Sequence, residues 1–407
     1  MNKSSLPGLS QRGRWLRPSP TFEVARLVKE VESTGKKVIN FGIGTPPKLL
    51  ELMTDSMRHQ VEESWKGTLS QLGTYYPGSG LQSLRDAISQ RFGNFVKEEV
   101  LVTGGGGKGG LHLALFATTD IGDKVVVPVP CWPTHFDLAR DLGCTIVPLS
   151  TYGNNFYINP DELEALFLRE NPKPKAIMYT SPNNPTGKNI DFETMMKIDE
   201  IAARHGAVVI SDEAYRGQEL VPAFDFTRYA DRDAGPVKLR VVSFSKIISL
   251  AGERLGFIEA PSYLIAKMTD YQSNHSGNPP IAGMAYAHAI LDHPDWPDFH
   301  KRALENLRKK QDAAWEILRA EGLDFVQPDG AFYIYLHLPE VKDSNIFAKE
   351  LLIEQQVGLI PGVVFDPEEG GSGNQQKHEY FRMAIGVATM EEIVEGARRI
   401  RRQLMKR

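Results

Sequence analysis

Several side chains that could do chemistry stand directly after short apolar runs in this chain. Asp212 and Tyr215 follow one such run, and Ser243 and Lys246 follow the next. A lysine that is desolvated at the end of a buried strand becomes a nucleophilic amine near neutral pH. Arg254 adds a guanidinium suited to an anion. Each of these residues alone also fits an ordinary role, as a helix cap or an exposed side chain. The hypothesis that they form one functional site therefore depends on their occurring together.

A glycine-rich segment, Gly104–Gly110, precedes these residues. It follows an expected strand and opens an expected helix, and backbone N–H groups at such a helix N-terminus bind phosphate. A dinucleotide-binding turn is an alternative, because the segment contains the GxGxxG spacing. That site needs an acidic residue about 20 positions later, and Val127–Pro130, which ends the next expected strand, has none. A P-loop does not fit, because Gly109 rather than Ser or Thr follows Lys108. A purely structural glycine turn remains open.

The turn Pro182–Gly187 would hold the Asn184 amide in one orientation, because prolines stiffen it. Together, these segments offer a phosphate cradle, a carboxylate, a phenol, an amide, an amine and a guanidinium. Pyridoxal phosphate uses all of these groups. Its phosphate would bind the glycine-rich segment and Arg254, its aldehyde would bond to Lys246, and its ring nitrogen would need an anionic partner.

The elements that would position these side chains alternate between strands and helices from about residue 98 to 260. The expected strands are Val100–Thr103, Lys124–Pro128, Thr145–Pro148, Ala176–Thr180, Ala207–Ser211, Leu239–Phe244 and Gly256–Ala260. Most are almost continuously apolar, as is typical of strands buried on both faces of a mostly parallel sheet. Expected helices include Pro160–Glu170 and Phe192–His205. The pattern predicts an α/β domain whose mostly parallel sheet is sandwiched by helices.

The two ends of the chain follow another pattern. A helix near Thr21–Thr34, capped by Ser19, leads to an extended piece, Val38–Ile43, and a further helix is expected over Leu81–Phe95. The later expected elements are helices over Tyr263–Asp292, Trp296–Glu321 and Met390–Met405, extended segments over Phe325–His337 and Val357–Val364, and a flexible loop at 368–373. We therefore predict an N-terminal segment (1–47) that packs with a small α+β domain (293–407), and a large cofactor-binding domain between them (48–292).

Composition narrows the classes of function. The formal net charge is only -4, from 47 Lys and Arg against 51 Asp and Glu, so no strong attraction to nucleic acid or an anionic membrane is expected. The two cysteines, Cys131 and Cys144, are too few for a disulfide framework, and the ten histidines have no metal-ligand spacing, so no metal is expected. No apolar run approaches the roughly 18 residues that span a bilayer. We expect a cytoplasmic protein.

The chain resembles the class I/II aminotransferases, the fold type I pyridoxal-phosphate enzymes, from about Pro18 to the C-terminus. The resemblance depends on three motifs in family order: Asn-Asn-Pro-Thr-Gly at 183–187, Asp-x-x-Tyr at 212–215 and Ser-x-Ser-Lys-x7-Arg at 243–254. It implies the same α/β fold, bound pyridoxal 5'-phosphate and a homodimer.

The resemblance also implies a role for each matched position. The residues that it assigns to the phosphate are Gly106, Gly107, Lys108, Ser243 and Arg254. Those that it assigns to the ring are Trp132, stacked on the pyridine, Asp212 at the nitrogen, and Asn184 and Tyr215 at the hydroxyl oxygen. Lys246 matches the Schiff-base lysine, which also carries the proton.

Further matched positions concern the substrate and the neighbouring subunit. Arg382 resembles the arginine that binds the substrate α-carboxylate, with Gly44 and Asn184 beside it. Tyr75 resembles a tyrosine that reaches the cofactor phosphate of the neighbouring subunit. The chain departs from the family pattern at three places, which are Thr45–Lys48, Glu253 and Asn274–Pro280. Which amino acid is used therefore stays open.

The expected activity is transfer of an amino group between an α-amino acid and an α-keto acid, with Lys246 moving the proton. One alternative is the same scaffold catalysing elimination, cyclisation or oxidation of an amino acid. A pyridoxal-phosphate sensor fused to a DNA-binding module is another, although only about 35 residues precede the first core strand, too few for a helix-turn-helix module. A nicotinamide-dependent dehydrogenase is weakened by the missing acidic residue.

Overall fold

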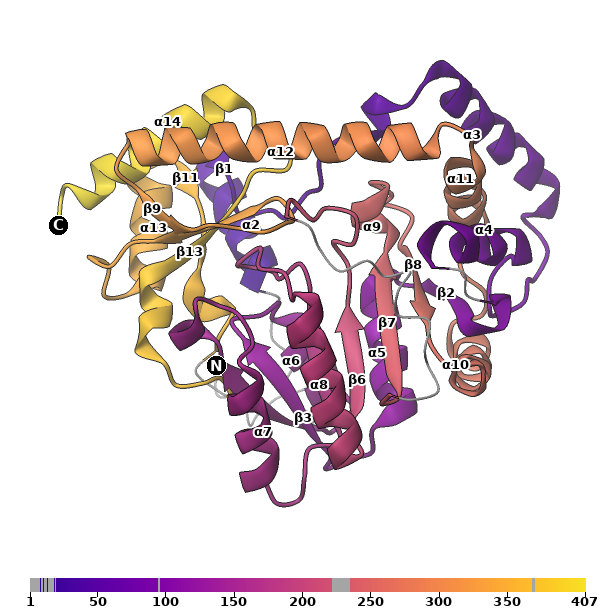
Figure 1. Cartoon of the computed structure of the whole chain (residues 1–407). Helices are drawn as coiled ribbons and strands as arrows, with labels where there is room; N and C mark the ends of the chain where they lie inside the picture. The colour runs from indigo at the N-terminus through magenta and orange to yellow at the C-terminus, as the bar shows by residue number, and fades with distance from the viewer. Residues whose placement is uncertain are drawn as a thin grey trace.

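The computed structural model of this chain describes residues 20–93, 96–221, 235–367 and 370–407, together with Gly8, Ser10, Gly13 and Pro18. Its strands form a seven-stranded sheet, a four-stranded sheet and a two-stranded pair. Figure 1 shows the large sheet in the centre of the molecule and the small sheet beside it under helix α12. Within the described residues, every helix is too short or too polar to cross a membrane.

The seven-stranded sheet confirms the expected α/β architecture. Its strands, in spatial order, are β2 (Val100–Gly104), β8 (Leu255–Glu259), β7 (Lys238–Ser243), β6 (Val208–Asp212), β5 (Ala176–Thr180), β3 (Lys124–Val129) and β4 (Thr145–Ser150). All neighbours run parallel except β8, which is antiparallel to both β2 and β7. Each expected strand lies within two residues of the observed one at either end. Buried apolar side chains on both faces explain why the sequence signal was strong.

Helices cover both faces of this sheet. Those on one face are α5 (Gly106–Thr118), α6 (Thr134–Asp141) and α10 (Ser262–His275), and those on the other are α7 (Pro160–Arg169) and α8 (Phe192–His205). Strand residues alternate between the two cores, because Val125 packs on the first face and Val126 on the second. The start of α7 follows the expected signal: the Asn159 side chain accepts a hydrogen bond from the Asp161 N–H, and Pro160 occupies the first turn.

One expected helix is wrong in its length. The segment Tyr263–Asp292 is not continuous, since α10 ends at His275 and α11 (Ile281–Asp292) begins after a break. Pro279 and Pro280 lie in that break, and proline has no N–H to donate to a helix. Helix α11 packs with α3 (Asp55–Thr68) and α4 (Gln82–Phe92) at the β2 edge of the sheet.

The four-stranded sheet is antiparallel throughout. Its order is β12 (Ile360–Pro361), β13 (Tyr380–Ala384), β10 (Tyr333–His337) and β9 (Asp324–Val326), so the expected segment Phe325–His337 is two strands. Beside it lie α13 (Ser344–Gln355), α14 (Met390–Leu404) and α2 (Pro20–Glu32). Ser19, the expected cap of α2, lies outside the described residues.

A strand pairing and a long helix connect the parts of the molecule. Strand β1 (Ile39–Asn40) pairs in parallel with β11 (Val357–Gly358), so the N-terminal segment joins the C-terminal part. Helix α12 (Trp296–Ala320) runs along the top of the molecule from the small sheet to α11 (Figure 1). Its Phe299 belongs to the core around α11, whereas its Leu318 belongs to the core of the small sheet. One long helix therefore supports both parts.

Candidate active site

A cavity of about 690 Å³ lies at the carboxyl ends of β6 and β7. In an open α/β sheet this edge is where ligands bind. Most of the site residues expected from the sequence line this cavity, and they are Gly44, Gly107, Lys108, Trp132, Asn184, Asp212, Tyr215, Ser243, Lys246, Arg254 and Arg382. Gly106 and Tyr75 do not line it.

The glycine-rich segment forms the turn between β2 and α5. Gly105 and Gly106 have positive φ angles of 80° and 72°, a conformation that favours glycine. A Cβ on Gly106 would lie 3.0 Å from Arg254 Nη2, and one on Gly107 would lie 3.1 Å from the Ser243 Cβ. The Gly106 N–H donates to the Arg254 carbonyl at 2.7 Å and so does not face the cavity. Of the three expected backbone donors, Gly107 and Lys108 are at the cavity wall, in the first turn of α5.

Arg254 and two serines complete this end of the cavity. The Arg254 guanidinium donates to the Ser245 hydroxyl at 3.3 Å and to the Gly105 carbonyl at 3.0 Å, which holds it beside the glycine turn. Ser243 ends β7, and Ser245 lies in the short helix α9 (Phe244–Ile247) that follows. Ser245 was not among the expected site residues, although it belongs to the motif that predicted Lys246.

Lys246 lies in α9, and its ammonium donates to the Gly44 carbonyl at 2.6 Å. Burial, together with the positive charges of Arg382 and Arg254, lowers the pKa of Lys246 to about 8. The amine is therefore much easier to deprotonate than an exposed lysine. Gly44 is constrained from the other side, since a Cβ there would lie 2.5 Å from the Tyr333 hydroxyl oxygen.

Asp212, the last residue of β6, places a buried carboxylate in the cavity wall. Its Oδ2 accepts a hydrogen bond from His135 Nε2 at 2.9 Å, and its Oδ1 accepts one from the Ala214 N–H at 3.1 Å. His135 is fully buried on α6. Sequence reasoning missed His135, because only the fold brings α6 next to the end of β6.

A chain of polar contacts connects the two sheets. The Asn184 amide donates to the Tyr215 hydroxyl at 3.4 Å, and that hydroxyl lies 2.8 Å from the hydroxyl of Tyr333. Burial raises the pKa of Tyr215 well above its ordinary value, so the phenol keeps its proton at neutral pH. Tyr333 was also missed, because nothing in its local sequence separates it from other core tyrosines.

Arg382 reaches the cavity from β13. Its Nη1 donates to the Asn184 Oδ1 at 3.0 Å and its Nη2 to the Gly42 carbonyl at 2.7 Å. Its Nε is buried without a hydrogen-bond partner in the described part of the chain. The guanidinium carbon lies 4.6 Å from the centre of the Tyr333 ring, within the range of a cation–π contact. The arginine is therefore held in a fixed orientation at the cavity wall.

Two expected residues have simpler surroundings. Trp132 lines the cavity, and the Lys108 ammonium lies 5.3 Å from the centre of its ring. Tyr75 is 93% exposed and does not line the cavity.

This donor set fits pyridoxal phosphate. The glycine turn at the start of α5, with Arg254 beside it, suits a phosphate. The Lys246 amine with its lowered pKa suits an aldehyde, and the Asp212 carboxylate suits a protonated ring nitrogen. Among the described residues, no group of three or more His, Cys, Asp or Glu could hold a metal ion.

Comparisons with known proteins point in the same direction. The family model described as "Aminotransferase class I and II" matches residues 36–400. The aspartate aminotransferase of Pyrococcus abyssi is 30% identical over 401 residues, which cover 93% of this chain and 95% of that protein. The aspartate/prephenate aminotransferase of Thermus thermophilus is 30% identical over 88% of this chain and 91% of its own length. Among solved structures, the Thermus thermophilus aspartate aminotransferase with maleate has a TM-score of 0.84 at 26% identity, covering 98% of this chain and 100% of that one.

Proposed function

The chain belongs to the class I and II aminotransferases, and we propose that the cavity at the ends of β6 and β7 is its active site. The enzyme is pyridoxal-phosphate dependent and moves an amino group between an α-amino acid and an α-keto acid. The observation that carries the assignment of the site is that Lys246, Asp212 and Arg254 line one cavity together.

When bound, pyridoxal phosphate supplies an aldehyde that takes up the substrate amino group and a ring that draws electrons away from the substrate Cα. The phosphate-binding residues would be the N–H groups of Gly107 and Lys108 with the side chains of Ser243, Ser245 and Arg254. The ring-binding residues would be Trp132, Asn184, Asp212 and Tyr215. The buried Asp212 carboxylate, hydrogen-bonded to His135, would pair with a protonated ring nitrogen.

Lys246 has two proposed tasks. Its Nζ would hold the cofactor before the substrate arrives. Once the substrate has displaced it, the free amine would take the proton from the substrate Cα and give the same proton back later in the reaction. The lowered pKa of about 8 supports both tasks, because a general base works best when its pKa lies near the working pH. The Gly44 carbonyl, 2.6 Å away, holds the free ammonium at the cavity wall.

Arg382 is the proposed site for the substrate α-carboxylate. A planar guanidinium binds a carboxylate with parallel charge-assisted hydrogen bonds. Asn184 and Tyr333 fix the plane of this guanidinium, so the carboxylate would bind in one orientation and set the direction of the Cα–H bond.

For the amino donor, we propose an acidic amino acid such as aspartate. The relatives from Pyrococcus abyssi and Thermus thermophilus carry aspartate in their names.

A single-turnover experiment tests the function. The protein loaded with pyridoxal phosphate is mixed with each amino acid of a panel and no keto acid. We expect aspartate or glutamate to convert the cofactor to its aminated form with one equivalent of the matching keto acid. Keto acid or ammonia formed without amination of the cofactor would instead show elimination or oxidation.

We further propose a cytoplasmic homodimer. The side chains of Leu69, Leu72 and Tyr75 are 51%, 57% and 93% exposed around one turn, which is unusual for a surface without a partner. The two cysteines are buried and free, which suits a reducing compartment. We also propose the division into 1–47, 48–292 and 293–407, supported by the pairing of β1 with β11.

A further inference from the structure

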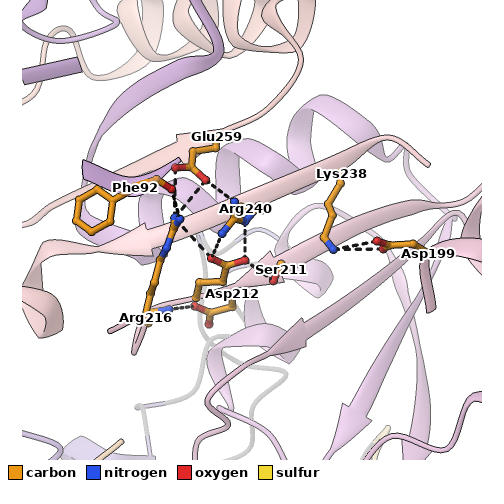
Figure 2. Close-up of polar contacts among 10 residues, drawn as sticks. Phe92, Asp199, Ser211, Asp212, Arg216, Lys238, Arg240 and Glu259 are labelled. Carbon is orange, nitrogen blue, oxygen red and sulfur yellow. Dashed lines mark hydrogen bonds and ion pairs between the residues drawn. The ribbon is translucent and has the colours of Figure 1, made fainter. Parts of the chain in front are cut away.

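Four charged side chains from β7, β8 and the turn after β6 are buried against one another. This buried charge cluster consists of Glu213, Arg216, Arg240 and Glu259, whose exposed fractions are 2%, 4%, 5% and 2%. Figure 2 shows Arg240 beside Glu259 and Arg216. Its members come from the turn after β6 (Glu213, Arg216), from β7 (Arg240) and from the end of β8 (Glu259).

Glu213 forms the centre of the cluster. Its two carboxylate oxygens accept hydrogen bonds from Arg240 Nε at 2.8 Å and Arg240 Nη2 at 2.9 Å, which is the bidentate fork geometry. The Ser211 hydroxyl donates to the same carboxylate at 3.0 Å. Burial alone would raise the pKa of Glu213, but the positive charges of Arg240 and Arg216 outweigh it and hold the pKa below its ordinary value. Glu213 is therefore ionised at neutral pH.

Glu259 closes the cluster from the other side. Arg216 Nη1 donates to both of its oxygens at 3.2 Å, and Arg240 Nη1 lies 3.0 Å from its Oε2. Arg216 also donates to the Phe92 carbonyl at the end of α4 (Figure 2). Burial raises the pKa of Glu259, and the positive charges of Arg216 and Arg240 oppose that shift. Removal of one member of the cluster would leave a buried charge without its partner.

The cluster holds the same turn that supplies two proposed cofactor contacts. Glu213 directly follows Asp212, and Arg216 directly follows Tyr215. Asp212 and Tyr215 line the cavity, whereas Glu213 and Arg216 point into the cluster. The Glu213 N–H donates to the Val241 carbonyl at 2.8 Å, so the backbone of the turn is also tied to β7. The turn is thus fixed beside each residue that faces the cofactor.

Stability alone does not account for this arrangement. A buried ion pair loses the hydration of both charges, and apolar side chains of similar volume often stabilise a protein as much or more. We propose that Glu213 is a positioning residue of the active site, whose fork with Arg240 fixes the orientation of Asp212 and Tyr215 toward the cofactor. This inference rests on the proposed function of the cavity.

The chain offers a matched control. Lys238 and Asp199 form a second buried ion pair, with Nζ and Oδ2 3.1 Å apart and both side chains less than a tenth exposed. Lys238 lies on β7, two residues before Arg240, and the pair lies apart from the cluster in Figure 2. Asp199→Asn, on α8, breaks a buried ion pair of the same strand. Within the described residues Asp199 makes no hydrogen bond or ion pair with the turn, and Lys238 acts on Glu213 through its more distant charge.

The first measurement is hydrogen–deuterium exchange of the full chain with and without cofactor. Glu213→Gln should speed exchange in the backbone of residues 209–218, and Asp199→Asn should leave that segment protected. The second is steady-state and isotope kinetics of the loaded enzyme. For Glu213→Gln, kcat should fall about 10- to 100-fold, the size expected when a reacting group is slightly misplaced. KM should change little, and the isotope effect with Cα-deuterated substrate should rise, because proton removal becomes slower.

The proposal is overturned if Glu213→Gln keeps the kcat and the protection of the wild type. It is also overturned if Asp199→Asn loses as much kcat as Glu213→Gln, because the effect would then be general damage to the sheet. If Glu213→Gln does not fold, Arg240→Lys replaces it, because this variant keeps the positive charge and loses the fork. Its kcat and its exchange protection are then compared with those of Asp199→Asn in the same way. A wild-type protein that is inactive toward all amino acids would refute the function instead, while the exchange measurement would still report on the turn.

Discussion

The hydroxyl groups of Tyr215 and Tyr333 lie 2.8 Å apart and join the two sheets of the molecule. Tyr215 follows β6 of the seven-stranded sheet, and Tyr333 begins β10 of the four-stranded sheet. The Tyr333 ring also packs against the Arg382 guanidinium. A shift of one sheet relative to the other would therefore alter a proposed cofactor contact and the proposed carboxylate site together.

Tyr333→Phe should weaken catalysis modestly. It removes one hydrogen bond to Tyr215, which is typically worth about 1 kcal/mol, and it keeps the ring that packs on Arg382. We expect kcat to fall about fivefold, with KM nearly unchanged. Tyr335→Phe is the control, since it removes a buried hydroxyl from the same strand away from the cavity. Equal losses in both variants would contradict a role for the Tyr215–Tyr333 contact.

Lys246 should be the point of cofactor attachment. Borohydride reduction of the loaded protein, followed by peptide mapping, should place the cofactor on Lys246. Because burial lowers the pKa of Lys246 to about 8, and only the uncharged amine attacks an aldehyde, attachment to cofactor-free protein should speed up as the pH rises toward 8 and level off above it. Stopped-flow absorbance measures that rate.

Lys108, the other cavity lysine, is the control for this assignment. Lys108→Ala should keep the label on Lys246 and the pH dependence of attachment. A reduced cofactor found on Lys108 in the wild type would refute the assignment, and so would an attachment rate that keeps rising as far as pH 10.

Arg382→Lys should raise the KM for amino acids strongly and lower kcat as well. Lysine keeps the charge but loses the planar fork, so binding weakens and the Cα–H bond is less well oriented. The absorbance of the bound cofactor should not change, because no cofactor contact is assigned to this residue. If Arg382→Lys lowers thermal stability and leaves KM and inhibition by dicarboxylates unchanged, the residue forms only a structural contact.

Tyr75 should act on the cofactor of the neighbouring subunit. Tyr75→Phe and Lys246→Ala subunits are prepared separately, unfolded together and refolded as a mixture. Each mixed dimer then has one site with both native residues, so about a quarter of all sites should regain full activity in an equal mixture. Activity that never exceeds the average of the two parents would refute the shared site, and a monomer in sedimentation analysis would refute the dimer.

The sequence alone determined the strands of the large sheet and the local motifs. Strands such as β5 and β6 are continuous apolar runs, and their signal does not depend on distant residues. The sequence also predicted that Asp212 and Lys246 meet in one cavity, since both follow strands of a parallel sheet and such residues lie at one edge. The break between α10 and α11 was readable in principle, because Pro279 and Pro280 mark it.

Only the tertiary structure decided which groups support these residues. His135 reaches Asp212 across 77 positions of sequence, and Tyr333 reaches Tyr215 across 118. The Gly106 N–H is taken up by the Arg254 carbonyl, so a donor expected from the motif does not face the cavity. The partners in the buried charge cluster likewise come from separate strands. The local sequence determines the hydrophobic period of a strand or helix and the residues of its turns. The contacts named above depend on how segments far apart in the sequence pack together, and no single segment determines that packing.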